Sequence, residues 1–261
     1  MAKIKPLKRF GQNYLVDENI LKKIAEEINP SNKDFILEIG PGFGALTKHI
    51  FAQTKNFAVV EIDSRVVEEL SVKFRGIEVI NKDFLELNLQ EISERKNSSL
   101  RIAGNIPYNI TSQILFKMID NITFIKDAVL MVQLEVAQRL NAKQGTKDYG
   151  ILAVIMQNFS DVKICFKVSP NVFYPKPKVH SALIHITFKE NQQSYEDKKF
   201  FLQTVKAAFG NRRKTLKNSL SNSIFGQLNF KDCNIDLSLR AEQLSINDFI
   251  TLAKFVQNNL T

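Results

Sequence analysis

The sequence predicts an α/β fold, in which a doubly wound, mostly parallel seven-stranded sheet ends in an antiparallel hairpin and a small C-terminal helical domain follows. Three observations predict it. Apolar runs alternate with amphipathic stretches through the first half of the chain, two later apolar runs have no helical stretch between them, and helical periodicity dominates the remainder.

The parallel part of the sheet is predicted by the first half of the chain. Strands are expected at residues 35–40, 56–62, 77–83, 101–104 and 128–133. Helices are expected at residues 45–53, 64–74, 111–119 and 135–142. Alternation of strand and helix implies parallel strands joined by crossover helices, which is the arrangement of an α/β layer fold.

The hairpin is predicted by two further apolar runs at residues 161–168 and 181–188. A proline-rich loop separates them and contains no helical stretch. Because parallel strands need a crossover connection, these two strands are expected to pair antiparallel at the end of the sheet.

A polar stretch at residues 190–199 is predicted to link two domains. Helical stretches follow at residues 200–209, 212–224 and 246–260. Ser245 is a suitable N-cap for the last of them, and Asp248 follows it by three residues, as in a capping box. We therefore place one domain at residues 1–189 and a helical domain at residues 190–261.

The composition indicates a sizeable core and a basic surface. The hydrophobic share is 44%, the net charge is +9 and the pI is about 9.4. Such a surplus favours a polyanionic partner, with a merely basic solvated surface as the alternative. The basic N-terminal stretch lacks the apolar core of a signal peptide, and the apolar runs are too short to span a bilayer, so the cytoplasm is the expected location.

Cysteine and histidine do not predict a metal site. Cys165 and Cys233 lie far apart and match no metal-ligand spacing. His180 and His185 are five residues apart in an expected strand, so their side chains point to opposite faces. We expect neither a bound metal nor a disulfide.

A glycine-rich loop follows the first predicted strand and opens a helix. It contains Gly40, Gly42 and Gly44 in G-x-G-x-G spacing, which differs from the G-x-G-x-x-G spacing of dinucleotide-binding loops. Glu38 stands two residues ahead and can offset positive charge. S-adenosylmethionine fits this pattern because it has no pyrophosphate but carries an amino group and a sulfonium. A tight turn without a ligand is the alternative.

Acidic residues stand at the carboxyl ends of the next two predicted strands, where ligands bind in open α/β sheets. Glu61 lies about 20 residues beyond the glycine loop and can accept hydrogen bonds from both ribose hydroxyls. Asp63 is a weaker candidate for the same task. Asp83 can accept from the adenine amino group of the cofactor.

The segment Asn105-Ile106-Pro107-Tyr108 follows the fourth predicted strand. An exocyclic adenine amine is a poor nucleophile because its lone pair is delocalised into the ring. The Asn105 side-chain oxygen and the Ile106 carbonyl can accept its hydrogens, Pro107 stiffens the turn, and Tyr108 offers a stacking face. These residues predict methylation of an adenine amine, with an ordinary polar turn as the alternative.

Phe173 begins a proline-rich segment, FYPKPKVHS, before the last predicted strand. Its ring is a candidate to stack on the other face of the target base. The segment is equally compatible with a rigid loop that carries a packed phenylalanine.

The chain resembles, from end to end, the small-subunit (16S) rRNA adenine dimethyltransferases, which are class I S-adenosylmethionine-dependent methyltransferases. The matching segments are KRFGQNYL (8–15), EIGPGFGALT (38–47), VVEID (59–63), NKDFL (81–85), AGNIPYNITS (103–112), LEVAQRL (134–140), GTKDYG (145–150), FYPKPKVHSALI (173–184) and FGNRRKTLKNSL (209–220). The resemblance implies transfer of two methyl groups to each of two adjacent adenines near the 3′ end of small-subunit rRNA. It also implies a role in biogenesis of the small subunit, because the RNA is modified in a partly assembled subunit.

The resemblance makes residues 1–189 a methyltransferase domain that binds S-adenosylmethionine. The cofactor contacts that it implies are Asn13, Leu15, Gly40, Glu61, Asp83 and Asn105. The catalytic residues are then Asn105, Pro107, Tyr108 and Phe173. Tyr14 stands where we expect Phe in this family.

Basic residues predict where the RNA binds. The helical domain concentrates cations within twelve residues that contain no acid, namely Lys206, Arg212, Arg213, Lys214 and Lys217. Lys5, Lys8 and Arg9 add a basic N-terminal arm. Such clusters contact phosphates and position a protein without reading sequence, whereas a charge run is otherwise a solvated helix face.

Three alternatives stay open from the sequence. Related 23S rRNA methyltransferases share the N-I-P-Y-like segment, but we expect EIGTGKG in them where this chain has EIGPGFG. A non-catalytic RNA-binding or assembly factor on the same scaffold would leave the cofactor motifs without a purpose. A DNA adenine methyltransferase would need base-reading elements, for which the small helical domain is a thin candidate. A monomer is expected.

Overall fold

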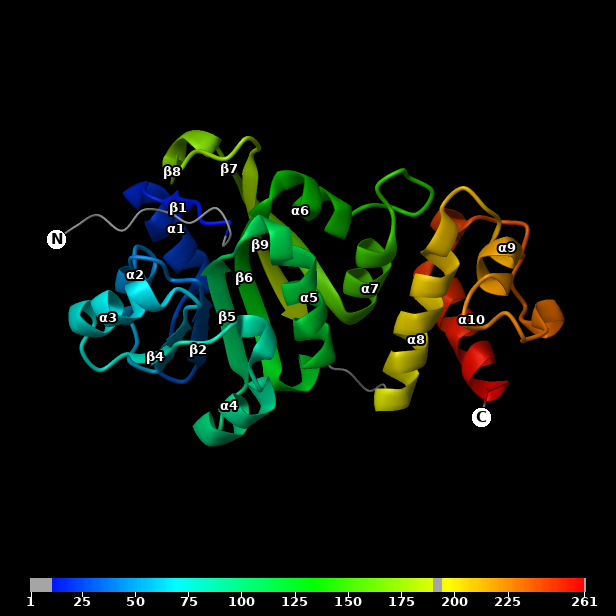
Figure 1. Cartoon of the computed structure of the whole chain (residues 1–261), viewed down its shortest axis with the longest axis horizontal. Coiled ribbons are helices and arrows are strands. Elements are labelled where there is room, and N and C mark those ends of the chain that lie inside the picture. The colour runs from blue at the N-terminus through cyan, green and yellow to red at the C-terminus, as the bar shows by residue number, and fades with distance from the viewer. Residues whose placement is uncertain (1–10, 190–193, 261) are drawn as a thin grey trace. The chain divides into compact units, whose positions relative to one another are not determined.

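The computed structural model describes residues 11–189 and 194–260. The chain forms two compact units (Figure 1). The first runs to Ala137 and also contains Asp161–Phe188, and the second contains Gln138–Ser160 and the chain from Lys189 onward. Among the described residues, no helix is long and apolar enough to cross a bilayer.

A seven-stranded sheet organises the first unit, in the order β4-β3-β2-β5-β6-β9-β7. Five of its strands pair in parallel, namely β2 (Phe35–Ile39), β3 (Phe57–Val60), β4 (Glu78–Ile80), β5 (Leu100–Asn105) and β6 (Ile125–Gln133). β9 (Ser181–Phe188) runs antiparallel to β6 and lies between β6 and β7 (Ser160–Val168). The predicted doubly wound sheet with a terminal hairpin is therefore confirmed.

Helices connect the strands of the first unit. They are α1 (Glu18–Ile28), α2 (Thr47–Phe51), α3 (Ser64–Lys73), α4 (Leu89–Lys96) and α5 (Thr111–Asp120), and α6 (Leu134–Leu140) begins in the first unit and ends in the second. α1 was not predicted, although its sequence carries the signals of a helix. Asp17 caps it by accepting from two backbone N–H groups, and the buried residues Leu21, Ile24, Ala25 and Ile28 have helical spacing.

Short 3₁₀ turns join several of these elements. They cover Phe84–Glu86, Tyr108–Ile110, Ile122–Phe124, Pro170–Val172, Phe209–Asn211, Phe230–Asp232 and Ala241–Gln243.

A second, two-stranded sheet ties the start of the described chain to the proline-rich loop. β1 (Tyr14–Leu15) pairs antiparallel with β8 (Phe173–Tyr174), and Leu15 lies opposite Phe173. The Val16 N–H extends the pairing by donating to the Val172 carbonyl at 2.9 Å. The core contains both Leu15 and Phe173, so this small sheet is held by apolar packing as well as by its ladder.

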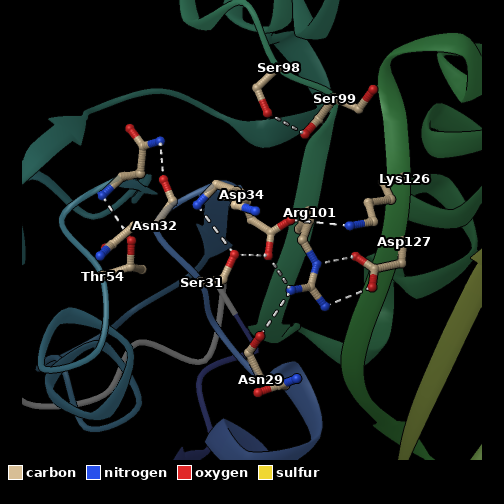
Figure 2. Close-up of polar contacts among 12 residues, drawn as sticks. Asn29, Ser31, Asn32, Asp34, Thr54, Ser98, Ser99, Arg101, Lys126 and Asp127 are labelled. Atoms are coloured by element: carbon tan, nitrogen blue, oxygen red, sulfur yellow. Dashed lines mark hydrogen bonds and ion pairs between the residues drawn. The ribbon is translucent and has the colours of Figure 1, made fainter.

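A buried arginine joins two strands of the large sheet (Figure 2). Arg101 on β5 makes two parallel 2.8 Å hydrogen bonds to the Asp127 carboxylate on β6. It also donates to Asp34 at 2.9 Å and to the Asn29 carbonyl at 3.2 Å, which fixes the turn between α1 and β2. This bidentate geometry offsets the cost of burying the guanidinium.

The second unit is helical and contains α7 (Ile151–Phe159), α8 (Tyr195–Ala208), α9 (Leu216–Ser221) and α10 (Ile246–Asn258). Residues 138–160, which the sequence placed in the first domain, group with this unit. The reason is that α7 is nearly all apolar, contacts α8 and α10, and packs the Phe159 ring edge-on against Phe201 at 5.7 Å.

Two helix starts in the second unit also differ from the prediction. Helix α8 begins inside the predicted linker, because Ser194 and Asp197 form a reciprocal capping box. The helix predicted at residues 212–224 is shorter, since Thr215 is extended and α9 starts only after it. The predicted capping box of Ser245 and Asp248 is confirmed at the start of α10.

Candidate functional site

Two cavities open at the carboxyl ends of the parallel strands of the first unit. One has a volume of about 330 Å³ and is lined by the residues that follow β2, β3, β4 and β5. The other, about 270 Å³, lies between the glycine loop, β1 and α1. They share Tyr14, Gly40 and Asn105, so the glycine loop and the segment after β5 border both.

The glycine loop leaves space for a ligand. Gly40 has a positive φ of 62°, and a Cβ atom placed on it would meet no protein atom within 4 Å. Gly42 also has a positive φ, of 52°, and a Cβ there would lie 2.7 Å from the Tyr14 ring. Glycine is therefore required at both positions by the backbone, and at Gly40 the open space belongs to the cavities.

Glu61 is nearly buried at the end of β3 and lines the larger cavity. Its carboxylate accepts from the Gly42 N–H at 3.2 Å and from the Asp63 N–H at 2.9 Å. Burial raises the pKa of Glu61, and these two backbone hydrogen bonds oppose that shift. The hydrogen bond to Gly42 links the acid after β3 to the glycine loop, a connection that the sequence did not reveal.

The two other acids at these strand ends have different surroundings. Asp83 lines the larger cavity and accepts from the Leu85 N–H at 2.9 Å, so its second oxygen is available to a ligand. Asp63 is paired with Arg65 at 2.6 Å and accepts from Gln12 at 3.2 Å. Asp63 is therefore paired within the protein and, unlike Glu61, it does not line the larger cavity.

Glu38 is fully enclosed beneath the glycine loop and lines the smaller cavity. It accepts from the Thr47 hydroxyl at 2.8 Å. Burial raises the pKa of Glu38 to about 8, which the Thr47 hydrogen bond only partly counteracts. A cation bound in this cavity would favour the ionised carboxylate.

Asn105 lines both cavities at the end of β5. Its side-chain nitrogen donates to the Asn13 carbonyl at 2.7 Å. A carbonyl can only accept, so this contact fixes the orientation of the amide and leaves the side-chain oxygen as the acceptor for another group.

The residues after Asn105 form a fixed turn. The Pro107 carbonyl accepts from the Ile110 N–H and the Thr111 hydroxyl, each at 3.3 Å. The Tyr108 hydroxyl lies 2.5 Å from the Ser181 hydroxyl of β9. The ring of Tyr108 is thus held from its far end while it lines the larger cavity.

Phe173 is the one predicted catalytic side chain that the structure does not bring to these cavities. It is 4% exposed, belongs to the core, and faces Leu15 across the β1–β8 pair. Among the described residues, those that line the two cavities do not include it. The arrangement corresponds to the packed phenylalanine, the alternative left open by the sequence.

The residues present fit S-adenosylmethionine. Every cofactor contact implied by the resemblance lines one or both cavities, namely Asn13, Leu15, Gly40, Glu61, Asp83 and Asn105. The Tyr14 hydroxyl is buried and has no hydrogen-bond partner in the part of the chain that the structure describes, which marks a polar position for a ligand. Among the described residues, no group of histidine, cysteine and acidic side chains is placed to hold a metal ion.

The five cations that the sequence predicts to bind RNA in the second unit are all exposed, namely Lys206, Arg212, Arg213, Lys214 and Lys217. Arg212 has a structural contact, since its guanidinium donates to the Lys147 carbonyl and to the Tyr149 carbonyl. Arg213 and Lys214 follow the 3₁₀ turn Phe209–Asn211. The predicted arm residues Lys5, Lys8 and Arg9 lie outside the described residues.

The proline-rich loop carries a basic hollow that the sequence analysis missed. Lys176, Lys178 and His180 line it together with Asn171. The available signal was charge, because residues 162–189 contain no acid. This basic hollow adjoins the candidate site through the chain, since Ser181 directly follows His180 and holds Tyr108.

Comparison with known proteins identifies relatives over nearly the whole chain. Residues 4–258 match the model of a family described as ribosomal RNA adenine dimethylase. A ribosomal RNA small subunit methyltransferase A from Francisella tularensis subsp. novicida is 39% identical over 258 residues, which cover 97% of this chain and 98% of that protein.

Solved structures agree in fold. A dimethyladenosine transferase from Plasmodium falciparum superposes with a TM-score of 0.78 at 26% identity, covering 94% of this chain and 98% of the other. A 23S rRNA methyltransferase, ErmE, superposes with a TM-score of 0.66 at 24% identity, covering 94% of this chain and 99% of the other.

Proposed function

Because the chain belongs to the ribosomal RNA adenine dimethylase family, we propose that it dimethylates two adjacent adenines near the 3′ end of small-subunit rRNA. The reaction is S-adenosylmethionine-dependent N6 methylation of adenine in rRNA. The observation that carries the proposal is the Asn105 amide, whose nitrogen is held by the Asn13 carbonyl so that its oxygen stays free to accept.

Asn105 and Ile106 activate the target amine. The Asn105 side-chain oxygen and the Ile106 carbonyl accept the two amine hydrogens, which localises the nitrogen lone pair outside the ring. Their positions are fixed before the base arrives, because Asn105 is tied to Asn13 and Pro107 stiffens the peptide after Ile106. Such preorganised acceptors favour the developing charge without further rearrangement.

Tyr108 positions the target base. Its ring lines the cavity, and the hydrogen bond to Ser181 keeps it there. Stacking of a base on an aromatic ring contributes about 1–3 kcal/mol. Bound S-adenosylmethionine supplies an electrophilic methyl group, and the protein contributes by holding the amine in line with it. Phe173 would need to leave the core before it could stack on the opposite face.

Basic surfaces hold the RNA backbone. Lys206, Lys217 and the cluster at Arg212–Lys214 provide exposed cations in the helical domain, and Lys8 and Arg9 extend the N-terminal arm. The target adenine must be unpaired or flipped to enter the cavity. We place the helical RNA-binding domain at residues 190–261, with residues 138–160 packed into the same unit.

The biological setting follows from this substrate. The protein acts in the cytoplasm, as a monomer, on a partly assembled small subunit, and the modification contributes to subunit biogenesis. Similarity to the Francisella ribosomal RNA small subunit methyltransferase A supports the choice of the small subunit over the large one.

The test is methyl transfer from labelled S-adenosylmethionine onto small subunits that lack the modification, followed by mass spectrometry of the nucleosides. We expect dimethyladenosine in small-subunit RNA. Transfer only to large-subunit RNA would move the assignment to the 23S enzymes. Tight binding to subunits without any transfer would favour an assembly factor.

Asn105→Ala provides the residue-level test. We expect turnover to fall by about 10²–10³-fold, as when one preorganised polar group is removed from an active site. Cofactor affinity should change by less than about tenfold, because only one hydrogen bond is lost. Unchanged turnover in this variant would exclude the role given to Asn105.

Asn105→Asp serves as the matched variant. Its carboxylate retains acceptors but cannot donate to the Asn13 carbonyl, so the side chain loses its fixed orientation. Turnover should therefore fall here too, and recovery to the wild-type rate would show that the Asn13 contact is unimportant.

A further inference from the structure

Among the described residues, the buried Tyr14 hydroxyl has no hydrogen-bond partner. Its oxygen is shielded from solvent and makes no hydrogen bond to any residue that the structure describes. Most buried polar atoms in folded proteins are paired, so each exception calls for a ligand, a water molecule or a functional reason. Tyr14 borders both cavities of the candidate site, which makes a ligand the relevant partner.

The surroundings of Tyr14 hold its ring in place. Its backbone pairs with Tyr174 in the β1–β8 sheet. The ring lies 4.8 Å from the Phe43 ring, centroid to centroid, and fills the space over Gly42. The hydroxyl therefore cannot find a partner by a simple rotation of the side chain.

Neither neighbouring acid accepts a hydrogen bond from this hydroxyl, and each is bonded to other donors among the described residues. The Glu61 oxygens accept from the Gly42 and Asp63 N–H groups. Asp63 is occupied by Arg65 and by Gln12. Burial and the negative charges of Glu61 and Asp63 raise the pKa of Tyr14 to about 12, so the phenol stays protonated and acts as a donor.

We propose that the Tyr14 hydroxyl donates a hydrogen bond to a ribose hydroxyl of bound S-adenosylmethionine, the same hydroxyl that donates to Glu61. A hydroxyl group can donate one hydrogen bond and accept another, so it can bridge a phenol donor and a carboxylate acceptor. The hydrogen bond from Tyr14 to the ribose hydroxyl and the bond from that hydroxyl to Glu61 strengthen one another, because linked hydrogen bonds polarise each other. The inference rests on the proposed cofactor site and names Tyr14 as a further positioning residue within it.

Calorimetric binding of S-adenosylhomocysteine tests the proposal without any RNA. Tyr14→Phe keeps the ring and removes only the hydroxyl. We expect its affinity for S-adenosylhomocysteine to fall by about five- to tenfold. The same titration is then run with analogues that lack the 2′ or the 3′ ribose hydroxyl.

The analogues distinguish a direct contact from a packing effect. For the analogue that lacks the bridging hydroxyl, Tyr14→Phe should lower the binding affinity by less than about twofold, because the hydrogen-bond partner of the phenol is already missing. An equal loss with all three ligands, or no loss with any, would overturn the proposal.

Two controls distinguish an error about the role of Tyr14 from an error about the cofactor site itself. Tyr149→Phe, at a buried tyrosine of the second unit, should leave affinity unchanged. The melting temperature of ligand-free Tyr14→Phe should equal or exceed that of the wild type, since an unpaired buried hydroxyl is removed, and a marked fall would contradict the proposal. Wild-type protein that fails to bind S-adenosylhomocysteine would overturn the cofactor site itself, whereas normal binding by both proteins would overturn only the role of Tyr14.

Discussion

At the scale of single residues, Glu38 makes cofactor binding depend on pH. Its carboxyl is enclosed beneath the glycine loop, and burial raises its pKa to about 8. The cavity that it lines is expected to receive the cationic part of S-adenosylmethionine, which would favour the carboxylate. Binding at pH 7 should therefore release protons from Glu38, and affinity should rise with pH until about pH 8.

The release is measured by titration calorimetry in two buffers of different ionisation enthalpy. Glu38→Gln keeps the shape of the side chain but cannot ionise. The difference in proton release between the wild type and this variant therefore gives the protons that come from Glu38, apart from those released by the ligand's own amino group. Glu68→Gln, on the exposed face of α3, is the control and should behave as the wild type. Equal proton release in the wild type and in Glu38→Gln would refute the coupling.

Most of the residues that the sequence singled out for the site line the two cavities, because of where they stand in the chain. Gly40, Glu61 and Asp83 stand at the ends of predicted strands and Asn105 directly follows one, and strand ends in an open α/β sheet meet at one edge. Tyr14 carries no such signal, and its unpaired hydroxyl is visible only in three dimensions. The burial of Phe173 depends on pairing between β1 and β8, which are far apart in sequence.

At the scale of elements, the proline-rich loop combines stiffness with positive charge. The basic hollow contains Lys176, Lys178 and His180, and Ser181 anchors the end of the loop to Tyr108. A stiff cationic loop whose end is tied to Tyr108 suits contacts with RNA phosphates.

Reversal of two charges in this loop tests that role. Lys176→Glu combined with Lys178→Glu should raise the KM for small subunits. The slope of log binding constant against log salt concentration should become shallower by roughly 0.7 for each phosphate contact that is lost. Affinity for S-adenosylhomocysteine should not change. Lys22→Glu with Lys23→Glu, on the exposed side of α1, is the matched double reversal, and an equal effect on KM would mean that only net charge matters.

Predicted elements were most accurate where apolar periodicity and a cap agree. Helix α10 starts at its predicted cap, Ser245. Helix α8 started earlier than predicted because the polar composition of residues 190–199 concealed the capping box at Ser194. Polar composition is shared by linkers and by solvated helix starts, so it cannot separate the two.

At the scale of the whole molecule, the order of strands could be predicted only in outline. The alternation of strand and helix predicted the parallel sheet, and the missing helix before β9 predicted the hairpin. The grouping of residues 138–160 with the helical unit could not be predicted, because it depends on which neighbours bury the apolar α7. Periodicity identifies an apolar surface but not its partner.

Long-range ion pairs also hold the first unit together, and they make its stability depend on pH. His185 on β9 lies 3.1 Å from Asp127 on β6 and 2.9 Å from Glu27 on α1. Lys163 and Cys165 on β7 are also electrostatic neighbours of Glu27. The hydrogen bond to Asp127 raises the pKa of His185, burial opposes it, and the hydrogen bond to Glu27 adds to the increase.

A histidine whose pKa is raised by folding stabilises the protein fully below its unfolded pKa of about 6.5. That contribution is lost as the pH rises through the higher pKa of the folded state. The unfolding free energy of the wild type, measured with urea, should therefore fall as the pH increases above about 6.5. In His185→Gln, the unfolding free energy should fall less over the same pH range. His180→Gln removes an exposed histidine from the basic hollow and should retain the wild-type slope, so equal slopes in all three proteins would exclude His185 as the cause.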